Sequence, residues 1–317
     1  MSPFFWIIVF ILSLAALVKG SDWVLDGAKK LGLWFGLSPF VVGVLIVGFG
    51  TSAPELVSSL VAVLSGVTEL PVANAIGSNI ANILLVVGIA AIASRKHLSI
   101  STDIVDVEIP LFILATALLF GIAVDGVVTI PEALLLLTGF VVYIVYNLSF
   151  SNGAAPVRGV RATAVERKPP TLKEAFFLFI GFVALIGGAH YLVQSVLALS
   201  EAFNIAVGII TILAVAIGTS LPEFFVSIKA ALQGDTDLSI GNIFGSNAFN
   251  ALVVVGIPGL IDHLTLDTPT LTVGLPALAV VSLIFAFSGL SRRIHVWEGA
   301  FYLLIYILFT AKLFNLF

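Results

Sequence analysis

Cysteine is absent from this 317-residue sequence, and charged residues are scarce. Without cysteine the chain has no disulfide, no thiolate metal site and no thiol redox chemistry. Charged residues make up 10% of the chain, whereas a soluble domain carries about 25%. The 14 basic residues form no basic patch, which excludes nucleic acid as a partner, and no protein partner is evident. No nucleophile is paired with a base, so the sequence predicts no enzyme.

Hydrophobic residues, by contrast, make up 60% of the chain, and the mean hydropathy is +1.18. Apolar segments of about 20 residues are long enough to cross a bilayer. We therefore predict an all-α integral membrane protein whose surroundings are the lipid bilayer of the cell membrane. The start of the chain lacks the positive region of a signal peptide, so we expect it to form the first span. The ten predicted spans are 3–19, 38–66, 71–94, 107–123, 127–149, 174–199, 205–232, 238–260, 268–289 and 295–316.

Basic residues set the orientation of these spans, because cytoplasmic loops carry an excess of lysine and arginine. With ten spans, 13 of the 14 basic residues fall on one side of the membrane, and only Lys312 does not. A missed span would scramble this agreement. The distribution predicts that both termini are external and that the central linker is cytoplasmic.

One long segment occurs twice. The sequence from Gly50 to Ile89 returns without a gap from Gly218 to Ile257, at a constant offset of 168 residues. Each half contains five predicted spans, an odd number, so the halves cross the membrane in opposite directions. This arrangement of inverted repeats is typical of secondary transporters with a site between the halves. The predicted division is a first repeat at 1–150, a cytoplasmic linker at 151–171 and a second repeat at 172–317.

Polar chemistry is what the two copies share. Pro54 and Pro222 lie inside predicted spans, where proline removes a helical hydrogen bond. This should free the carbonyls around Gly50 and Thr51 in the first copy and around Gly218 and Thr219 in the second. Such carbonyls are tolerated at membrane depth where they line a cavity or meet a ligand. Glu55 and Glu223 follow the prolines directly and supply two negative charges, and a glutamate inside a membrane is functional by default.

Hydroxyl and amide oxygens complete the predicted site. Ser78 and Asn82 lie four residues apart and share a helical face, as do their equivalents in the second copy. Each of these residues alone has an ordinary structural explanation, but their conjunction at identical spacing in both copies indicates a site. Oxygen ligands suit hard cations such as Na⁺ and Ca²⁺, and the donor set does not separate the two. The remaining members are Ser246, Asn250, Ser52 and Ser220. Small residues should let these helices approach closely, namely Gly48, Ala53, Gly77, Ala216 and Gly245.

At these motifs the sequence resembles a known family. GTSAPE and GTSLPE, followed by GSNIAN and GSNAFN, are similar to the paired repeats of the Na⁺/Ca²⁺ exchanger family, in particular its compact prokaryotic members. The resemblance implies an antiporter with bound Ca²⁺ and Na⁺ as its transported ions and no cofactor. It implies that Glu55 and Glu223 are shared ligands and that the carbonyls of Thr51 and Thr219 bind Ca²⁺. Na⁺ sites would be completed by Ser52, Ser78, Ser220, Ser246 and carbonyls near Gly48 and Ala216, with Asn82 and Asn250 facing the centre.

Two comparisons within the resemblance bear on ion selectivity. K⁺-dependent exchangers and some prokaryotic relatives carry an acid where this chain has Asn250, so its site has two formal charges and K⁺ cotransport is disfavoured. Proton-coupled Ca²⁺ exchangers typically show a GNxxE pattern where this chain has GTSxPE, which favours Na⁺ over H⁺. A Ca²⁺/H⁺ antiporter using the same carboxylates is the alternative, and a cation channel is a second.

Overall fold

A computed structural model describes residues 2–35, 50–94, 97–101, 104–151 and 169–316. In these ranges eight helical stretches are long and apolar enough to cross a membrane. A ninth is formed if Val207–Thr219 and Leu221–Leu232, which meet at 49°, count as one span. Of the predicted span 38–66, the residues up to 49 lie outside the described part, as does most of the predicted linker. The chain is therefore a mostly helical, multi-pass membrane protein.

The described elements are almost entirely helical, and several helices contain π-helical turns, labelled η. The first half contains α1 (Pro3–Trp34), α3 (Ala53–Leu64), α4 (Leu70–Ala81), η2 (Asn82–Val87), α5 (Gly88–Ala93), β1 (His97–Ser99), η3 (Ile104–Glu108), α6 (Ile109–Ala123), β2 (Val127–Val128) and α7 (Ile130–Ser151). The second half begins with α8 (Leu172–Phe203), α9 (Val207–Ile210), η4 (Thr211–Val215), α10 (Ala216–Thr219) and α11 (Leu221–Leu232). It continues with α12 (Thr236–Phe249), η5 (Asn250–Val254), α13 (Gly256–Gly259), β3 (Leu264–Thr265), η6 (Thr270–Gly274), α14 (Leu275–Leu290), β4 (Arg293–His295) and α15 (Val296–Leu313).

Helix α1 is longer than predicted. We expected the first span to end near residue 19, with Lys19 and Lys30 in a cytoplasmic loop, but the helix continues to Trp34. Ion pairs within the helix accommodate part of this charge, with Lys19 Nζ at 3.1 Å from Asp22 and Lys29 Nζ at 3.7 Å from Asp26. Side chains three residues apart lie on one face of a helix and can form such pairs. The charged residues that follow the apolar segment therefore did not end the helix.

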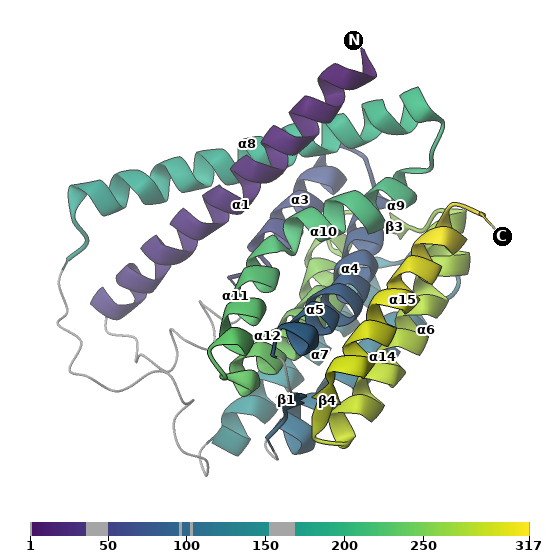
Figure 1. The fold of residues 1–317 in the computed structure, drawn as a ribbon. Coiled ribbons are helices and arrows are strands. Elements are labelled where there is room, and N and C mark those ends of the chain that lie inside the picture. Colours follow the sequence, from purple (N-terminus) through teal and green to yellow (C-terminus); the bar gives the residue numbers. More distant parts are fainter. Residues whose placement is uncertain (1, 36–49, 95–96, 102–103, 152–168, 317) are drawn as a thin grey trace.

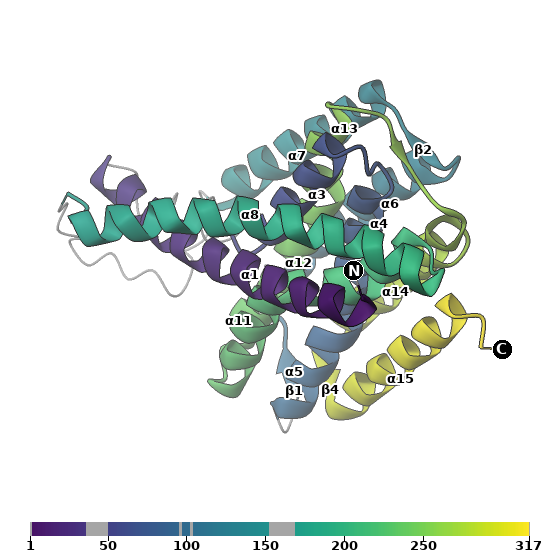
Figure 2. The same cartoon turned by 90° about the horizontal axis from the view of Figure 1, so that it is seen from above.

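Helices α1 and α8 form a long pair that lies across one face of the bundle (Figures 1 and 2). Glycines bring their backbones together: a Cβ on Gly20 would lie 2.6 Å from the Leu185 nitrogen, and one on Gly188 would lie 2.9 Å from the Leu17 nitrogen. Small residues permit this close approach of helices in membranes. The pair therefore packs as one unit against the remaining helices.

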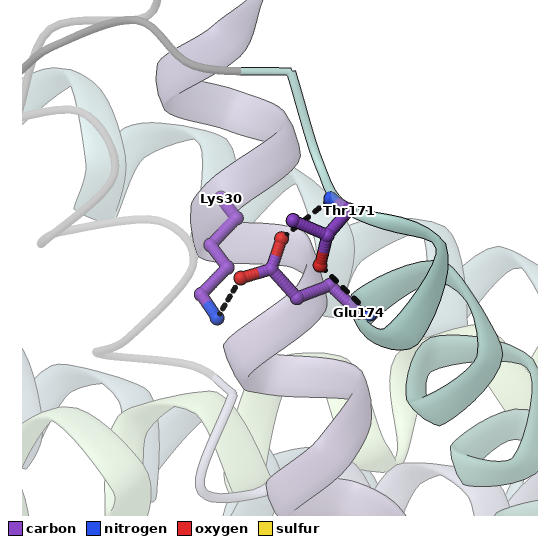
Figure 3. A network of polar contacts seen from close by, with 3 residues as sticks. All are labelled: Lys30, Thr171 and Glu174. Atoms are coloured by element: carbon purple, nitrogen blue, oxygen red, sulfur yellow. Dashed lines mark hydrogen bonds and ion pairs between the residues drawn. The ribbon is translucent and has the colours of Figure 1, made fainter.

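A polar network closes one end of this pair (Figure 3). The Thr171 hydroxyl accepts a bond from the Glu174 N–H at 3.3 Å, and the Glu174 carboxylate accepts one from the Thr171 N–H at 2.7 Å. This reciprocal capping box satisfies two N–H groups at the start of α8. Lys30 of α1 donates to the same carboxylate at 2.7 Å, which ties the two helices together.

Two short antiparallel ladders join loops of the two halves. In the first, His97 of β1 pairs with His295 of β4, and in the second, Val127 of β2 pairs with Thr265 of β3. The offset of 168 residues converts one ladder into the other, because His97 then corresponds to Thr265 and Val127 to His295. The ladders lie at opposite ends of the α4–α5 span (Figure 1).

The interior of the bundle is built around two spans. In the 18-residue apolar stretch of each helix, 83% of the residues are buried for Leu70–Ala93 and 78% for Thr236–Gly259, against 44% or less for the other six helices of membrane-spanning length. A helix that is apolar all round and covered by protein belongs to the centre of a bundle. These central spans carry the GSN motifs, so the repeated polar residues lie in the best-covered part of the molecule.

Candidate functional site

Each repeated proline lies in the first turn of a helix. Pro54 is the second residue of α3, and Pro222 is the second residue of α11. Proline suits the first turn of a helix, where its missing N–H needs no partner. Glu55 and Glu223 fall in the same first turns, where the helix dipole favours negative charge. In the second half, where we predicted free carbonyls within a span, the helix breaks between α10 and α11 with a bend of 49°.

The two carboxylates are joined to the opposite half by reciprocal hydrogen bonds. The Ser52 hydroxyl donates to Glu223 Oε1 at 2.7 Å, and the Ser220 hydroxyl donates to Glu55 Oε1 at 3.0 Å. Both glutamates are fully buried. Charge-assisted bonds of this kind are roughly twice as strong as neutral ones. The starts of α3 and α11 therefore meet at one place in the core.

Several buried oxygen atoms of the predicted site residues have no hydrogen-bond partner. They include Oε2 of both glutamates, the Ser78 hydroxyl and the side-chain oxygens of Asn82 and Asn250, all in fully buried residues. The Thr51 and Ser246 hydroxyls lie beside Glu223 and the Thr219 hydroxyl beside Glu55. A buried polar atom without a partner is costly, so such a group calls for a ligand. The donor chemistry, carboxylate with hydroxyl and amide oxygen, fits Na⁺ or Ca²⁺.

Not every predicted carbonyl is free. The Gly50 carbonyl accepts bonds from the Ala53 N–H and from the Ser21 hydroxyl of α1, each at 3.3 Å. The Ala216 carbonyl accepts the Ser220 N–H at 3.0 Å and the Thr219 hydroxyl at 3.3 Å. The expectation of free carbonyls is thus wrong for Gly50, because a helix distant in sequence supplies a donor.

The two threonines predicted to bind Ca²⁺ through their carbonyls lie next to the starts of α3 and α11. Thr51 lies in the turn before α3, and Thr219 is the last residue of α10. Both positions are next to the serines that bond the carboxylates. Gly48 lies outside the described residues.

Sequence reasoning missed two asparagines that support the carboxylates. Asn74 donates to the Glu55 carbonyl at 3.2 Å and to the Ser59 hydroxyl at 3.2 Å. Asn242, its equivalent 168 residues on, donates to the Glu223 carbonyl at 3.4 Å and to the hydroxyl of Ser227 at 3.0 Å. The signal was present, because both asparagines are identical in the aligned copies. They fix the first turn of each glutamate-bearing helix.

Asparagines of the GSN motifs form a second missed feature. Asn79 donates to the Asn247 carbonyl at 3.0 Å, and Asn82 donates to Asn247 Oδ1 at 3.0 Å. All three residues and Asn250 are fully buried. We call these four residues the asparagine cluster. It joins the two central spans of the bundle.

The cluster coincides with a change of helix type. Asn82 begins η2 and Asn250 begins η5, each a π-helical segment that follows a regular helix. Single π-helical turns occur frequently at functional sites. The last residue of each repeated motif therefore marks the same local distortion in both halves.

One small residue of the motifs allows a close helix contact. A Cβ on Gly77 would lie 2.6 Å from Cα and from the carbonyl oxygen of Ile212, so the helices approach closely there, as predicted. At the equivalent Gly245 the nearest atom of the described residues is the Tyr143 hydroxyl, at 3.9 Å. The equivalents of Ile212 and Ala216 in the first half are residues 44 and 48, which lie outside the described part, so close contact at Gly245 stays a prediction.

This chain is similar to proteins of a known family. The family model described as sodium/calcium exchanger protein matches residues 5–149 and 173–315. The putative antiporter CaxA of Alkalimonas amylolytica is 34% identical over 97% of this chain and 98% of the relative. The sodium/calcium exchanger MaX1 of Methanosarcina acetivorans is 29% identical over 97% of this chain and 98% of the relative. A structure of the sodium-calcium exchanger NCX_Mj soaked with Na⁺ and Sr²⁺ gives a TM-score of 0.64 at 28% identity, covering 97% of this chain and 98% of that chain.

Proposed function

This chain belongs to the sodium/calcium exchanger family and is an antiporter of Ca²⁺ and a second cation, and we propose that this cation is Na⁺. Both ions use one site in the membrane, in alternation. The proposed ligands are Glu55 and Glu223 with Thr51, Thr219, Ser52, Ser220, Ser78, Ser246, Asn82 and Asn250. The carbonyls of Gly48 and Ala216 are the least supported of the expected ligands, since the first lies outside the described residues and the second already accepts two bonds.

The reciprocal bonding of the carboxylates carries this proposal. Each glutamate uses Oε1 to accept a serine hydroxyl and retains Oε2 without a partner, deep inside the protein. A cation between the two Oε2 atoms satisfies both and neutralises charge that is costly to bury. Without a cation these atoms have no counterpart in the described residues.

Ten spans in two inverted five-span repeats are part of the proposal, with both termini external and the linker at 151–171 cytoplasmic. Contacts between loops support this topology. The β1–β4 ladder, the Lys30–Glu174 ion pair and the bond from the Ser101 N–H to Asp237 each join segments predicted on the cytoplasmic side. The β2–β3 ladder and the Thr68–Thr265 hydroxyl contact at 2.9 Å join segments predicted on the external side.

Obligatory exchange follows from the charge of the site. Two carboxylates without cations are costly to move through a closed state that excludes water. The protein therefore changes its facing direction only when one Ca²⁺, or Na⁺ ions, occupy the site. Na⁺ moving inward down its gradient then drives Ca²⁺ outward.

The moving part in this proposal is the α1–α8 pair, which slides or rocks against the bundle. Its glycine packing supports movement as one unit. Because the chain has no native cysteine, disulfides can be introduced to fix α1 and α8 to the bundle. Transport that persisted with these disulfides formed would contradict the sliding mechanism.

Transport in proteoliposomes tests the function. Vesicles loaded with Na⁺ and diluted into Na⁺-free buffer should take up ⁴⁵Ca²⁺, and K⁺-loaded vesicles should not. Glu55→Gln and Glu223→Gln should each abolish uptake, whereas Glu201→Gln, at an exposed position of α8, should not. Uptake driven by a pH gradient alone would assign the protein to Ca²⁺/H⁺ antiport, and uptake without any counter-cation would indicate a channel.

A further inference from the structure

Three pairs of hydrogen bonds around the proposed site follow the internal repeat. When each residue is replaced by its equivalent 168 positions away, most bonds of one half become bonds of the other half. The three related pairs are Ser52 to Glu223 with Ser220 to Glu55, Asn74 to Glu55 with Asn242 to Glu223, and Asn74 to Ser59 with Asn242 to Ser227. The local structure is therefore close to two-fold symmetric.

The asparagine cluster breaks this symmetry. Asn79 donates to the Asn247 carbonyl and Asn82 donates to Asn247 Oδ1. The equivalent bonds would run from Asn247 Nδ2 to the Asn79 carbonyl and from Asn250 Nδ2 to Asn79 Oδ1. Neither forms, and the three side-chain atoms that they require, Asn247 Nδ2, Asn250 Nδ2 and Asn79 Oδ1, are buried without partners. The three unpartnered atoms are thus the ones that would form the hydrogen bonds of the symmetry-related arrangement.

The consequence for the site concerns which end of each amide faces the ion. An amide presents either its oxygen, which binds a cation, or its NH₂ group, which repels one. Because Asn82 Nδ2 is bonded to Asn247, its oxygen is left for the ion, and that oxygen has no other partner. Asn250 has no such bond, and both ends of its amide are unpartnered. One amide is thus oriented while the other is not.

We propose that Asn79 and Asn247 are positioning residues that orient the amides of Asn82 and Asn250 in alternation during transport. This inference rests on the proposed function, in which inverted halves exchange conformations between the two facing states. In the state described here Asn247 orients Asn82. In the opposite state Asn79 orients Asn250, and the bonds to Asn247 are released. Each state then has one oriented amide and one free amide.

Aspartate substitutions test this assignment, because aspartate keeps the acceptor and removes the donor. Asn79→Asp loses the bond to the Asn247 carbonyl in the present state but keeps the acceptor for Asn250 in the opposite state. Asn247→Asp keeps the acceptor for Asn82 and loses the donor used in the opposite state. Both variants add the same charge at equivalent positions, so an opposite response isolates the lost donor.

The measurement is the half-saturating Ca²⁺ concentration of exchange from each face, in right-side-out and inside-out vesicles. The ratio of the two values follows the equilibrium between the facing states. Asn79→Asp should change the ratio about fivefold in one direction and Asn247→Asp about fivefold in the other, as expected for one hydrogen bond. Asn74→Asp and Asn242→Asp are matched controls whose bonds are already symmetric, and they should leave the ratio unchanged.

Shifts of the ratio in the same direction, or an unchanged ratio in both variants, would overturn the assignment. If the variants do not fold, a structure of the wild-type protein in its opposite-facing state decides the question: Asn250 should lie within hydrogen-bonding distance of Asn79, and Asn82 should have left Asn247. An Asn82–Asn247 bond retained in that state would refute the inference. Failure of the proposed function is distinct, because Glu55→Gln would then leave Ca²⁺ uptake intact.

Discussion

Substitution of Gly77 by alanine tests the close packing of α4 against η4 and α10. The new Cβ would lie 2.6 Å from Cα and from the carbonyl oxygen of Ile212, and 2.8 Å from Cβ of Ala216. Backbone atoms cannot rotate away as a flexible side chain can. To reach an ordinary contact, α4 must separate from η4 and α10 by about 0.8 Å.

The expected cost follows from two opposing terms. Overpacking costs about 1–3 kcal/mol, and a contact with backbone belongs at the upper end. Alanine in a helix recovers about 0.5–1 kcal/mol relative to glycine. We therefore expect Gly77→Ala to destabilise the protein by about 2 kcal/mol, and its thermal unfolding midpoint in detergent to fall by several degrees.

Gly77→Ala should also weaken ion binding. Gly77 directly precedes Ser78, and the residues that it contacts, Ile212 and Ala216, lie in the helix that ends at Thr219. Separation of these helices moves ligands of the two halves apart. Loss of a group that supports metal ligands typically weakens metal affinity about 10–100-fold. We expect the half-saturating Ca²⁺ concentration of exchange to rise at least about tenfold.

Two glycines serve as controls. Gly121 of α6 is exposed, and a Cβ on it or on Gly241 of α12 would have no atom of the described residues within 4 Å. Gly121→Ala and Gly241→Ala should therefore leave the midpoint unchanged or raise it. Effects of these two substitutions on stability and ion affinity as large as that of Gly77→Ala would refute the packing argument.

Three further predictions concern the carboxylates, the ions and the start of α8. Ser52→Ala and Ser220→Ala each remove a hydrogen bond from a hydroxyl to a buried carboxylate, which is worth about 1.5–3 kcal/mol. Each substitution should therefore raise the half-saturating Na⁺ and Ca²⁺ concentrations of exchange about tenfold or more. An effect of only one of the two substitutions would contradict the reciprocal arrangement. Ca²⁺ at about 100 times its dissociation constant stabilises the folded state by about 2.7 kcal/mol, so its removal by a chelator should lower the unfolding midpoint of the wild type. The same chelation should have no effect on Glu55→Gln or Glu223→Gln, and a persistent shift in these variants would place the Ca²⁺ site elsewhere. Thr171→Ala removes the N-cap of α8 and should lower the stability by about 1 kcal/mol, measured as a lower unfolding midpoint. Lys30→Gln removes a solvent-exposed ion pair and should lower the midpoint less. A larger effect of Lys30→Gln would show that the cap is unimportant.

The sequence alone determined the membrane environment, most span positions and the identity of the central polar residues. These properties are local: an apolar run of sufficient length crosses a bilayer, and a proline in the interior of a helix removes a hydrogen bond. The repeat added long-range information, because identical spacing in two copies indicated that Glu55 and Glu223 act together. The same alignment contained Asn74 and Asn79 with their equivalents, which sequence reasoning passed over.

Only the tertiary structure decided which of these groups have partners. Ser52 bonds the glutamate 171 residues away and not that of its own half, Ser21 of α1 bonds the Gly50 carbonyl, and Gly77 packs tightly against the backbone of Ile212. The asparagine cluster likewise uses one of two arrangements that the repeat makes equivalent. Two identical copies of a motif specify the same chemistry, but hydrogen bonding and close packing depend on neighbours from distant parts of the chain, and those neighbours differ between the halves.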